Sequence, residues 1–154
     1  MLSAQVSTVL DLAQSLAEAH PALFLIQGPG RGDRVTAAYI KALRISAAER
    51  LGRDFAECSL TSGHGARVDY WFPEESTIIE IAFGLRNPLS EFERDVLKAV
   101  MARAAGVSVE HLVLLAKPGA HSRLKAPWFR AVIRWARSQG ITVHIRELAY
   151  PATG

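Results

Sequence analysis

Apolar residues recur along this chain with two different periods. A period of three to four residues places Val6, Leu10, Ala13 and Ala17 on one face of a helix. The segments with this period, each expected to be a helix, are 4–19, 35–43, 46–51, 91–104 and 127–138. Ser46, followed three residues later by Glu49, has the spacing of a capping box, which predicts that 46–51 is a separate short helix.

Short runs rich in β-branched and aromatic residues lie between the helical segments and predict strands. These runs are 55–60, 68–72, 77–83, 111–116 and 141–145. Residues 23–27 form a further apolar segment that is either a strand or a linker. The order of elements predicts an α/β fold, a three-layer α/β/α sandwich with a central mixed sheet.

The two strands around the turn 73–76 form a hairpin whose register follows from the sequence. If Phe72 lies opposite Thr77, each step along one strand is matched by a step back on the other. This register brings Asp69 opposite Glu80.

Alternation gives the hairpin two different faces. Asp69 and Glu80 share one face with Arg67 and Ala82. The other face is expected to pack in the core, and it carries Val68, Tyr70, Phe72, Ile79, Ile81 and Phe83. Opposed carboxylates destabilise a strand pair and raise each other's pKa unless a divalent metal or an arginine neutralises them.

A hairpin with an Asp on its first strand, a Glu in an apolar second strand and a helix after it resembles the PD-(D/E)XK nuclease superfamily. Asp69 and Glu80 match the two acids of that motif, whereas Val68 replaces its Pro and Ala82 replaces its Lys. The resemblance implies a restriction-endonuclease-like fold in which Asp69 and Glu80 bind Mg²⁺ or Mn²⁺. Similarity to members that carry the cation on the following helix nominates Lys98 as the third catalytic residue.

The length of 154 residues, 49% of them apolar, predicts a single domain over 1–154. The resemblance implies that 46–146 form the nuclease-like core, to which 1–45 add N-terminal helices and 147–154 a tail. There is no run of eighteen apolar residues and no basic N-terminal leader, so a soluble cytoplasmic protein without a membrane partner is expected. A single cysteine, Cys58, excludes an internal disulfide and a cysteine-based zinc site.

The helix expected after the hairpin has a charged face, on which Glu91, Arg94, Asp95 and Lys98 recur at steps of three and four. This face is either a solvent-exposed set of ion pairs or the floor of the metal site. The sequence leaves open whether Lys98 or an arginine faces the two hairpin acids.

Charge is unevenly distributed. Seven acids lie in 69–95, whereas 117–146 contains seven basic residues and no acid. An acidic centre beside basic surface suits a metal-dependent enzyme that acts on a polyanion, and solvated helix faces are the alternative. The residues expected to contact phosphate are Arg67, Lys117, Arg123, Lys125, Arg130 and Arg134. Trp128 and Trp135 have helical spacing and are expected in the core rather than as platforms for bases.

Three further features have a functional and an ordinary interpretation. The glycine-rich segment 28–32 lacks the spacing and the lysine of a phosphate-binding loop, which favours a turn. His64 is either a solvated loop residue or an acid–base group near the carboxylates. Glu49 is either the capping residue described above or an additional acid of the site.

Two functions from different classes follow. The first is a metal-dependent endonuclease that hydrolyses phosphodiesters, of DNA rather than RNA, with Asp69, Glu80 and Lys98 as its catalytic residues. The second is a member of the same fold that has lost catalysis and binds nucleic acid or protein, with a homodimer as one of its forms. Ala82 in the place of the motif lysine favours the second.

Overall fold

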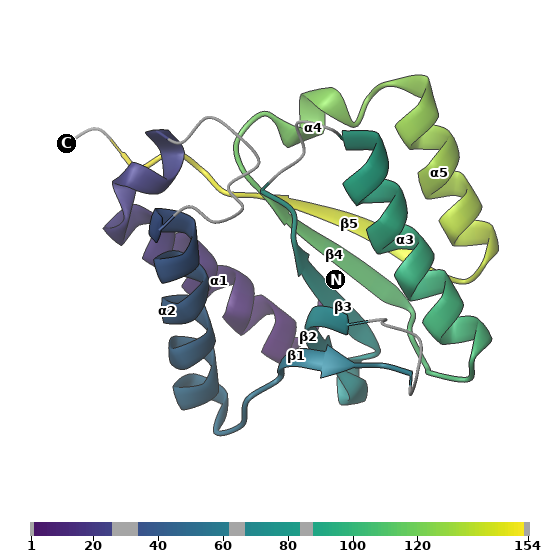
Figure 1. The fold of residues 1–154 in the computed structure, drawn as a ribbon, viewed down its shortest axis with the longest axis horizontal. Coiled ribbons are helices and arrows are strands. Elements are labelled where there is room, and N and C mark those ends of the chain that lie inside the picture. The colour runs from purple at the N-terminus through teal and green to yellow at the C-terminus, as the bar shows by residue number, and fades with distance from the viewer. Residues whose placement is uncertain (1, 26–33, 62–66, 84–87, 153–154) are drawn as a thin grey trace.

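The structure is a computed structural model that describes residues 2–25, 34–61, 67–83 and 88–152, without the side chains of 88–90. A five-stranded mixed sheet lies between two groups of helices (Figure 1). The α/β class and the mixed sheet expected from the sequence are therefore confirmed.

The elements alternate along the chain much as their periodicity indicates. The helices are α1 (Ala4–Ala19), α2 (Arg34–Leu51), α3 (Pro88–Ala104), α4 (Ala120–Arg123) and α5 (Pro127–Ser138), with two 3₁₀ turns at Pro21–Leu25 and Pro73–Glu75. The strands are β1 (Ala56–Ser59), β2 (Arg67–Phe72), β3 (Thr77–Ile81), β4 (His111–Ala116) and β5 (Thr142–Glu147).

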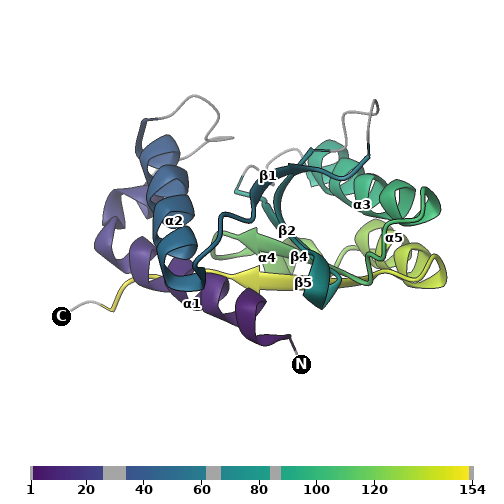
Figure 2. The same ribbon diagram turned by 90° about the horizontal axis from the view of Figure 1, so that it is seen from below.

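The strands lie in the sheet in the order in which they occur along the chain, β1-β2-β3-β4-β5. The first three pair in antiparallel fashion, and β3, β4 and β5 are parallel to one another. Each parallel connection crosses over through a helix, α3 after β3 and α5 after β4. Consequently α3 and α5 lie side by side on one face of the sheet, and α1 and α2 cover the other (Figure 2).

Both faces of β3 are buried, whereas the sequence predicted apolar packing on only one of them. On the α1 and α2 side, Tyr70, Phe72 and Ile79 belong to one apolar cluster. On the α3 and α5 side, Ile78 and Ala82 belong to a second cluster. Val68 also packs in this second cluster rather than with Tyr70. The sheet has helices on both sides, so β3 needs apolar side chains in both directions.

Helix boundaries differ from the prediction at two places. The segments 35–43 and 46–51 form one continuous helix, α2, because Tyr39, Leu43 and Ala47 extend an unbroken buried stripe at steps of four. Ser46 therefore lies inside a helix and does not cap one. In addition, α3 begins at Pro88, so Ser90 lies inside its first turn.

Trp128 and Trp135 were expected in the core, and this is wrong. Their exposed fractions are 56% and 44%, whereas Phe129 and Ala136 on the same helix are buried. The two indoles lie on the flank of α5, since the sheet covers only part of the helix surface.

No helix in the described part of the chain combines the length and the apolar character needed to cross a bilayer. The expected C-terminal tail, 147–154, begins inside β5, and Leu148 is buried. The Leu148 amide donates to the carbonyl of Ala116, 2.8 Å away, so the sheet pairing continues past β5.

The N-terminus of α1 is capped from the hairpin turn rather than by Ser3, whose side chain makes no capping bond. The Glu75 carboxylate accepts hydrogen bonds from the amides of Gln5 (2.9 Å) and Val6 (3.1 Å). We expect Glu75→Ala to lower the free energy of unfolding by about 1–2 kcal/mol, because two amides lose their acceptor and the helix dipole loses a nearby anion.

Urea denaturation measures this effect, and Glu74→Ala is the matched control. Glu74 lies on the same turn in an exposed ion pair with Arg53 (3.2 Å), which should contribute little. Equal stability of the two variants would show that the Glu75 cap is not significant.

Candidate functional site

The two hairpin acids meet where the β2–β3 ladder ends. The ladder pairs Phe72 with Thr77 and Tyr70 with Ile79, which confirms the predicted register. The next step of this register brings Asp69 opposite Glu80.

Side chains replace the strand-to-strand hydrogen bonds at this step. The amide of Ile81 donates to Asp69 Oδ2 at 2.7 Å, and the amide of Asp69 lies 3.4 Å from Glu80 Oε2. Each carboxylate thus accepts a hydrogen bond from a backbone amide of the opposite strand, which fixes both carboxylates at the point where the ladder ends.

Lys98 of α3 supplies the cation of the cluster. Its Nζ lies 2.7 Å from Glu80 Oε1, 3.1 Å from the carbonyl oxygen of Arg67 and 3.4 Å from Asp95 Oδ1. The helix that follows the hairpin therefore crosses directly over the acid pair. Asp69, Glu80, Asp95 and Lys98 are called the acidic cluster below.

Arg67 does not face the acid pair, although the alternation of the strand predicts that it would. Its guanidinium lies 2.8 Å from Glu57 Oε2 on the neighbouring strand, and its side chain is 64% exposed. Glu57 has a left-handed backbone (φ 52°), which departs from regular strand geometry. The Lys98 ammonium contacts Glu80 in this structure.

Asp95 belongs to the cluster but was not among the predicted site residues. The sequence placed it on the charged face with Lys98, three residues away, and this spacing was the available signal. Its side chain is 12% exposed. On the described part of that face, Asp95 and Lys98 thus lie toward Glu80, whereas Arg94 is exposed.

Burial makes the charge of these carboxylates costly. Burial, with the nearby charges of Asp69 and Asp95, raises the pKa of Glu80 to about 8, and the Lys98 ammonium opposes only part of that rise. Burial likewise raises the pKa of Asp95 to about 6. Burial lowers the pKa of Lys98, but its hydrogen bond with Glu80 and the adjacent acids outweigh this effect and raise it overall. At neutral pH the cluster therefore carries fewer than three negative charges on its three carboxyl groups.

This arrangement predicts an unusual pH dependence of stability. The pKa of Glu80 is raised from 4.5 to about 8 on folding, so the folded protein keeps a proton that the unfolded chain releases in this window. Stability should fall as pH rises through it, by roughly 3–5 kcal/mol, and level off above it. Glu80→Gln cannot titrate and should lack this component.

The measurement is the difference in unfolding free energy between the wild type and Glu80→Gln at a series of pH values, because other titrating groups cancel in the difference. A difference that does not change between pH 5 and pH 8 would contradict the raised pKa.

The donors present suit magnesium or manganese. Asp69 and Glu80 offer carboxylate oxygens, and Mg²⁺ is commonly held by one or two carboxylates together with substrate phosphate and water. Within the described ranges no three His, Cys, Asp or Glu side chains are grouped so as to hold a metal ion. A cation would thus depend on the two hairpin acids and on the substrate.

None of the residues expected to contact phosphate is a member of the acidic cluster. Arg123, Lys125, Arg130 and Arg134 are exposed on α4, on α5 and between them. Lys117 follows directly after the carboxyl end of β4, which lies beside the carboxyl end of β3. Its Nζ is 5.7 Å from the ring centre of Phe83.

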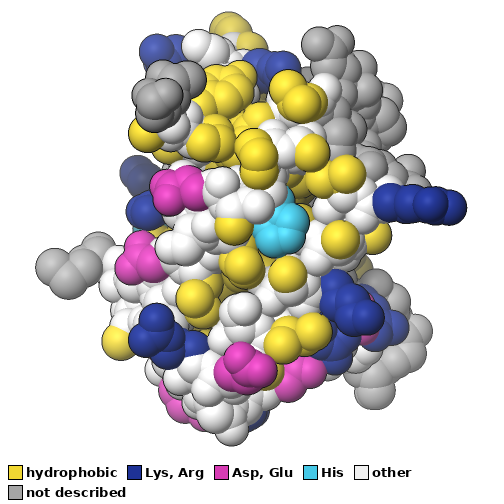
Figure 3. Space-filling model, turned by 90° about the vertical axis from the view of Figure 1, so that its left-hand side faces the viewer, with side chains coloured by type: hydrophobic (Ala, Val, Ile, Leu, Met, Phe, Trp, Pro, Cys, Tyr) yellow, Lys and Arg dark blue, Asp and Glu magenta, His cyan; other side chains and the backbone are white. Residues whose placement is uncertain are grey.

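Several other predicted features do not join the site. Glu49 is exposed on α2, which covers the sheet face opposite to α3. His64 and the glycine-rich segment 28–32 lie outside the described residues. On the side where α1 and α2 lie, acidic and basic side chains are interspersed, in contrast to the acid-free segment 117–146 (Figure 3).

Comparison with protein-family models, with curated proteins and with solved structures finds no match to this chain.

Proposed function

We propose that the protein is a metal-dependent nuclease of the PD-(D/E)XK kind, with a restriction-endonuclease-like fold, that hydrolyses phosphodiester bonds in DNA. The observation that supports this most strongly is the position of Lys98. Its ammonium lies 2.7 Å from the buried carboxylate of Glu80, on the strand position that faces Asp69. The lysine missing at Ala82 thus has a candidate substitute on the following helix.

The energetics of the cluster also favour a functional role. Three carboxyl groups and one ammonium are largely withdrawn from water, which seldom stabilises a fold as well as apolar packing would. Strongly raised pKa values of grouped acids are typical of functional sites. The surrounding cluster, which includes Ile78, Ala82 and Leu114, is apolar, and it could accommodate an apolar side chain at position 80.

Each residue has a defined role in this proposal. Asp69 and Glu80 would hold Mg²⁺ or Mn²⁺, and the ion, when bound, would offset the charge that develops on the phosphate during hydrolysis. The Lys98 ammonium would orient the attacking water and stabilise the negatively charged transition state. The exposed cations of α4 and α5 would hold the flanking phosphates.

Cleavage of plasmid, single-stranded and branched DNA tests the proposal. The purified protein should cleave at least one of these in Mg²⁺ or Mn²⁺, and EDTA should stop the reaction. Glu80→Ala, prepared identically, should not cleave. Equal cleavage by both proteins would identify a contaminating nuclease and contradict the proposal.

The second candidate is a nuclease-like protein that binds nucleic acid or protein without cleaving it. Ala82 favours this candidate, since it is 3% exposed in an apolar cluster and leaves no cation on that strand. DNA retention that weakens with salt and in Arg130→Ala/Arg134→Ala, without cleavage, would support it.

A further inference from the structure

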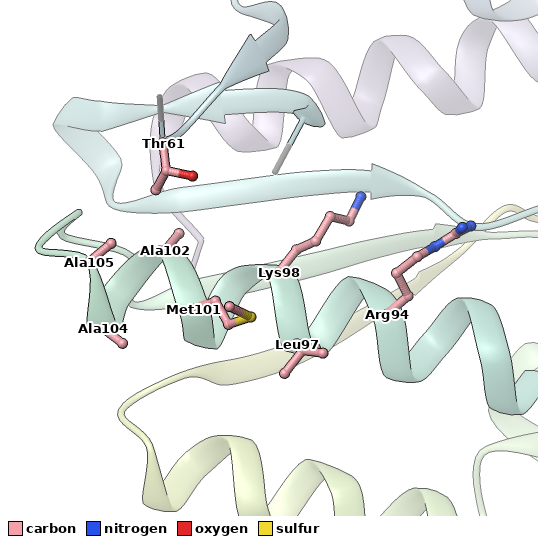
Figure 4. Close-up of a pocket in the computed structure, with 8 residues that line it drawn as sticks. All are labelled: Thr61, Arg94, Leu97, Lys98, Met101, Ala102, Ala104 and Ala105. Carbon is pink, nitrogen blue, oxygen red and sulfur yellow. The ribbon is translucent and has the colours of Figure 1, made fainter. Parts of the chain in front are cut away.

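A groove runs along α3 next to the acidic cluster. It encloses about 370 Å³, and its wall is mainly apolar, with Leu97 and Met101 among the lining residues. Arg94, Lys98 and Thr61 complete the wall. Figure 4 shows Lys98 directed toward the strands on one side of α3 and Leu97 directed toward α5 on the other. Lys98 thus belongs both to the groove and to the acidic cluster, which makes the two continuous.

The exposed tryptophans lie on α5, which packs beside α3, and they are not among the residues that line the groove. The indole Nε1 of Trp128 donates to Glu93 Oε1 at 2.6 Å, which fixes Trp128 at the seam between α3 and α5. Leu97 is one turn after Glu93, and Trp135 is two turns after Trp128, so both continue along the same seam. Because α3 and α5 each connect two parallel strands, they run in the same direction and keep the two rows together.

The size of the exposed apolar surface requires an explanation. Leu97, Met101, Trp128 and Trp135 have exposed fractions of 47%, 56%, 56% and 44%. Grouped exposed apolar side chains of this size commonly mark a binding surface.

The charges around this surface indicate its partner. Arg94 lines the groove, and Arg130 and Arg134 are exposed on α5. A second copy of the chain would bring these arginines close to one another, which opposes self-association. A flat anionic lipid surface would meet the arginines but would leave the concave groove of about 370 Å³ unfilled. An unpaired nucleic acid strand offers phosphates to the arginines and flat base surfaces to the apolar and indole side chains.

We propose that the α3 groove and the indoles of Trp128 and Trp135 bind an unpaired strand of nucleic acid. Its bases contact Leu97, Met101 and the two indoles, and its phosphates contact Arg94 and the arginines of α5. Duplex DNA hides the faces of its bases, so the surface selects single-stranded or locally unpaired substrates. The inference deepens the proposed function, on which it rests for the position of the scissile phosphate beside Lys98.

Fluorescence anisotropy of a labelled oligodeoxythymidine tests this proposal in EDTA, where binding is measured without cleavage. The wild type should bind this strand more tightly than a duplex of equal length. Trp128→Leu/Trp135→Leu and Leu97→Ser/Met101→Ser should each weaken binding by on the order of tenfold or more. The matched control is Ile40→Ser/Ile45→Ser, which removes exposed apolar side chains from α2 on the opposite face and should bind like the wild type.

Several results would overturn the inference. Unchanged affinity of the tryptophan variant, or equal affinity for strand and duplex, would remove its basis. Binding of phosphatidylserine vesicles that displaces the oligonucleotide would identify a lipid surface instead. A doubling of mass in sedimentation that is lost in Leu97→Ser/Met101→Ser would identify a second copy as the occupant.

Failure of this inference and failure of the proposed function are distinguishable. If the wild type cleaves DNA but the tryptophan variant keeps wild-type binding and cleavage, only the strand-binding surface is wrong. If the wild type binds single strands through the tryptophans but cleaves nothing in Mg²⁺ or Mn²⁺, only the nuclease assignment is wrong.

Discussion

Lys98→Met should lower the free energy of unfolding by about 3 kcal/mol at pH 9, because it leaves the carboxylates of Glu80 and Asp95 buried without their cation. The loss should be smaller at pH 6, where Glu80 takes up a proton and no longer needs a counter-charge. The same variant should cleave DNA on the order of 100-fold more slowly or not at all, since it lacks the ammonium that stabilises the transition state.

A double-mutant cycle separates the pair from other effects of the substitution. Glu80→Gln removes the charge that Lys98 compensates, so Lys98→Met should cost much less stability in that background than in the wild type. Urea denaturation of the four proteins at pH 9 gives the coupling. A Lys98→Met protein as stable as the wild type at pH 9 would contradict a direct contact between the Lys98 ammonium and the Glu80 carboxylate.

The rate of metal-dependent cleavage should rise about tenfold per pH unit between pH 6 and pH 8 and become constant above it. Glu80 binds a cation only after losing its proton, and its pKa is about 8. The overall change from pH 6 to the plateau above pH 8 is therefore about 100-fold, in the direction of faster cleavage at higher pH.

Single-turnover rates at saturating DNA and at a fixed Mn²⁺ concentration well below saturation measure this profile, and Glu74→Gln, which alters an exposed acid of the hairpin turn, serves as the control. The control should have the wild-type profile. A rate that does not change from pH 6 to pH 8 would show that Glu80 does not need to ionise for the reaction.

The hairpin register could be predicted because it depends only on local features. The turn length and the alternation of side chains fix which residues oppose one another, and Phe72 opposite Thr77 sets Asp69 opposite Glu80. The strand His111–Ala116 and the helix Pro127–Ser138 likewise have the predicted boundaries, since each is a continuous run with a clear stop.

Local patterns alone could not decide between Lys98 and Arg67 as the cation beside Glu80, because the choice depends on tertiary packing. Lys98 reaches Glu80 only because α3 crosses back over β2 and β3, which no local pattern specifies. Arg67 shares the predicted face but is drawn to Glu57 on β1. The pairing of β1 with β2 spans a loop, and neither a short turn nor a run of alternating residues fixes its register.

The position of the tryptophans could not be predicted for a related reason. Helical spacing distinguishes an apolar face from a polar one, but it does not tell how much of a broad apolar face the sheet covers. In α5 the covered part contains Phe129 and Ala136, and Trp128 and Trp135 remain on its flank.

Calorimetric titration of Mn²⁺ into the protein at pH 7 tests most directly whether the acidic cluster is a metal centre. We expect Mn²⁺ to bind and to release close to one proton, which is measured from the dependence of the heat on the ionisation enthalpy of the buffer. Binding should be lost in Asp69→Asn and in Glu80→Gln and kept in Glu74→Gln. A metal centre at this cluster would be contradicted if Mn²⁺ does not bind either with or without DNA. It would also be contradicted if Mn²⁺ still binds to Asp69→Asn and Glu80→Gln.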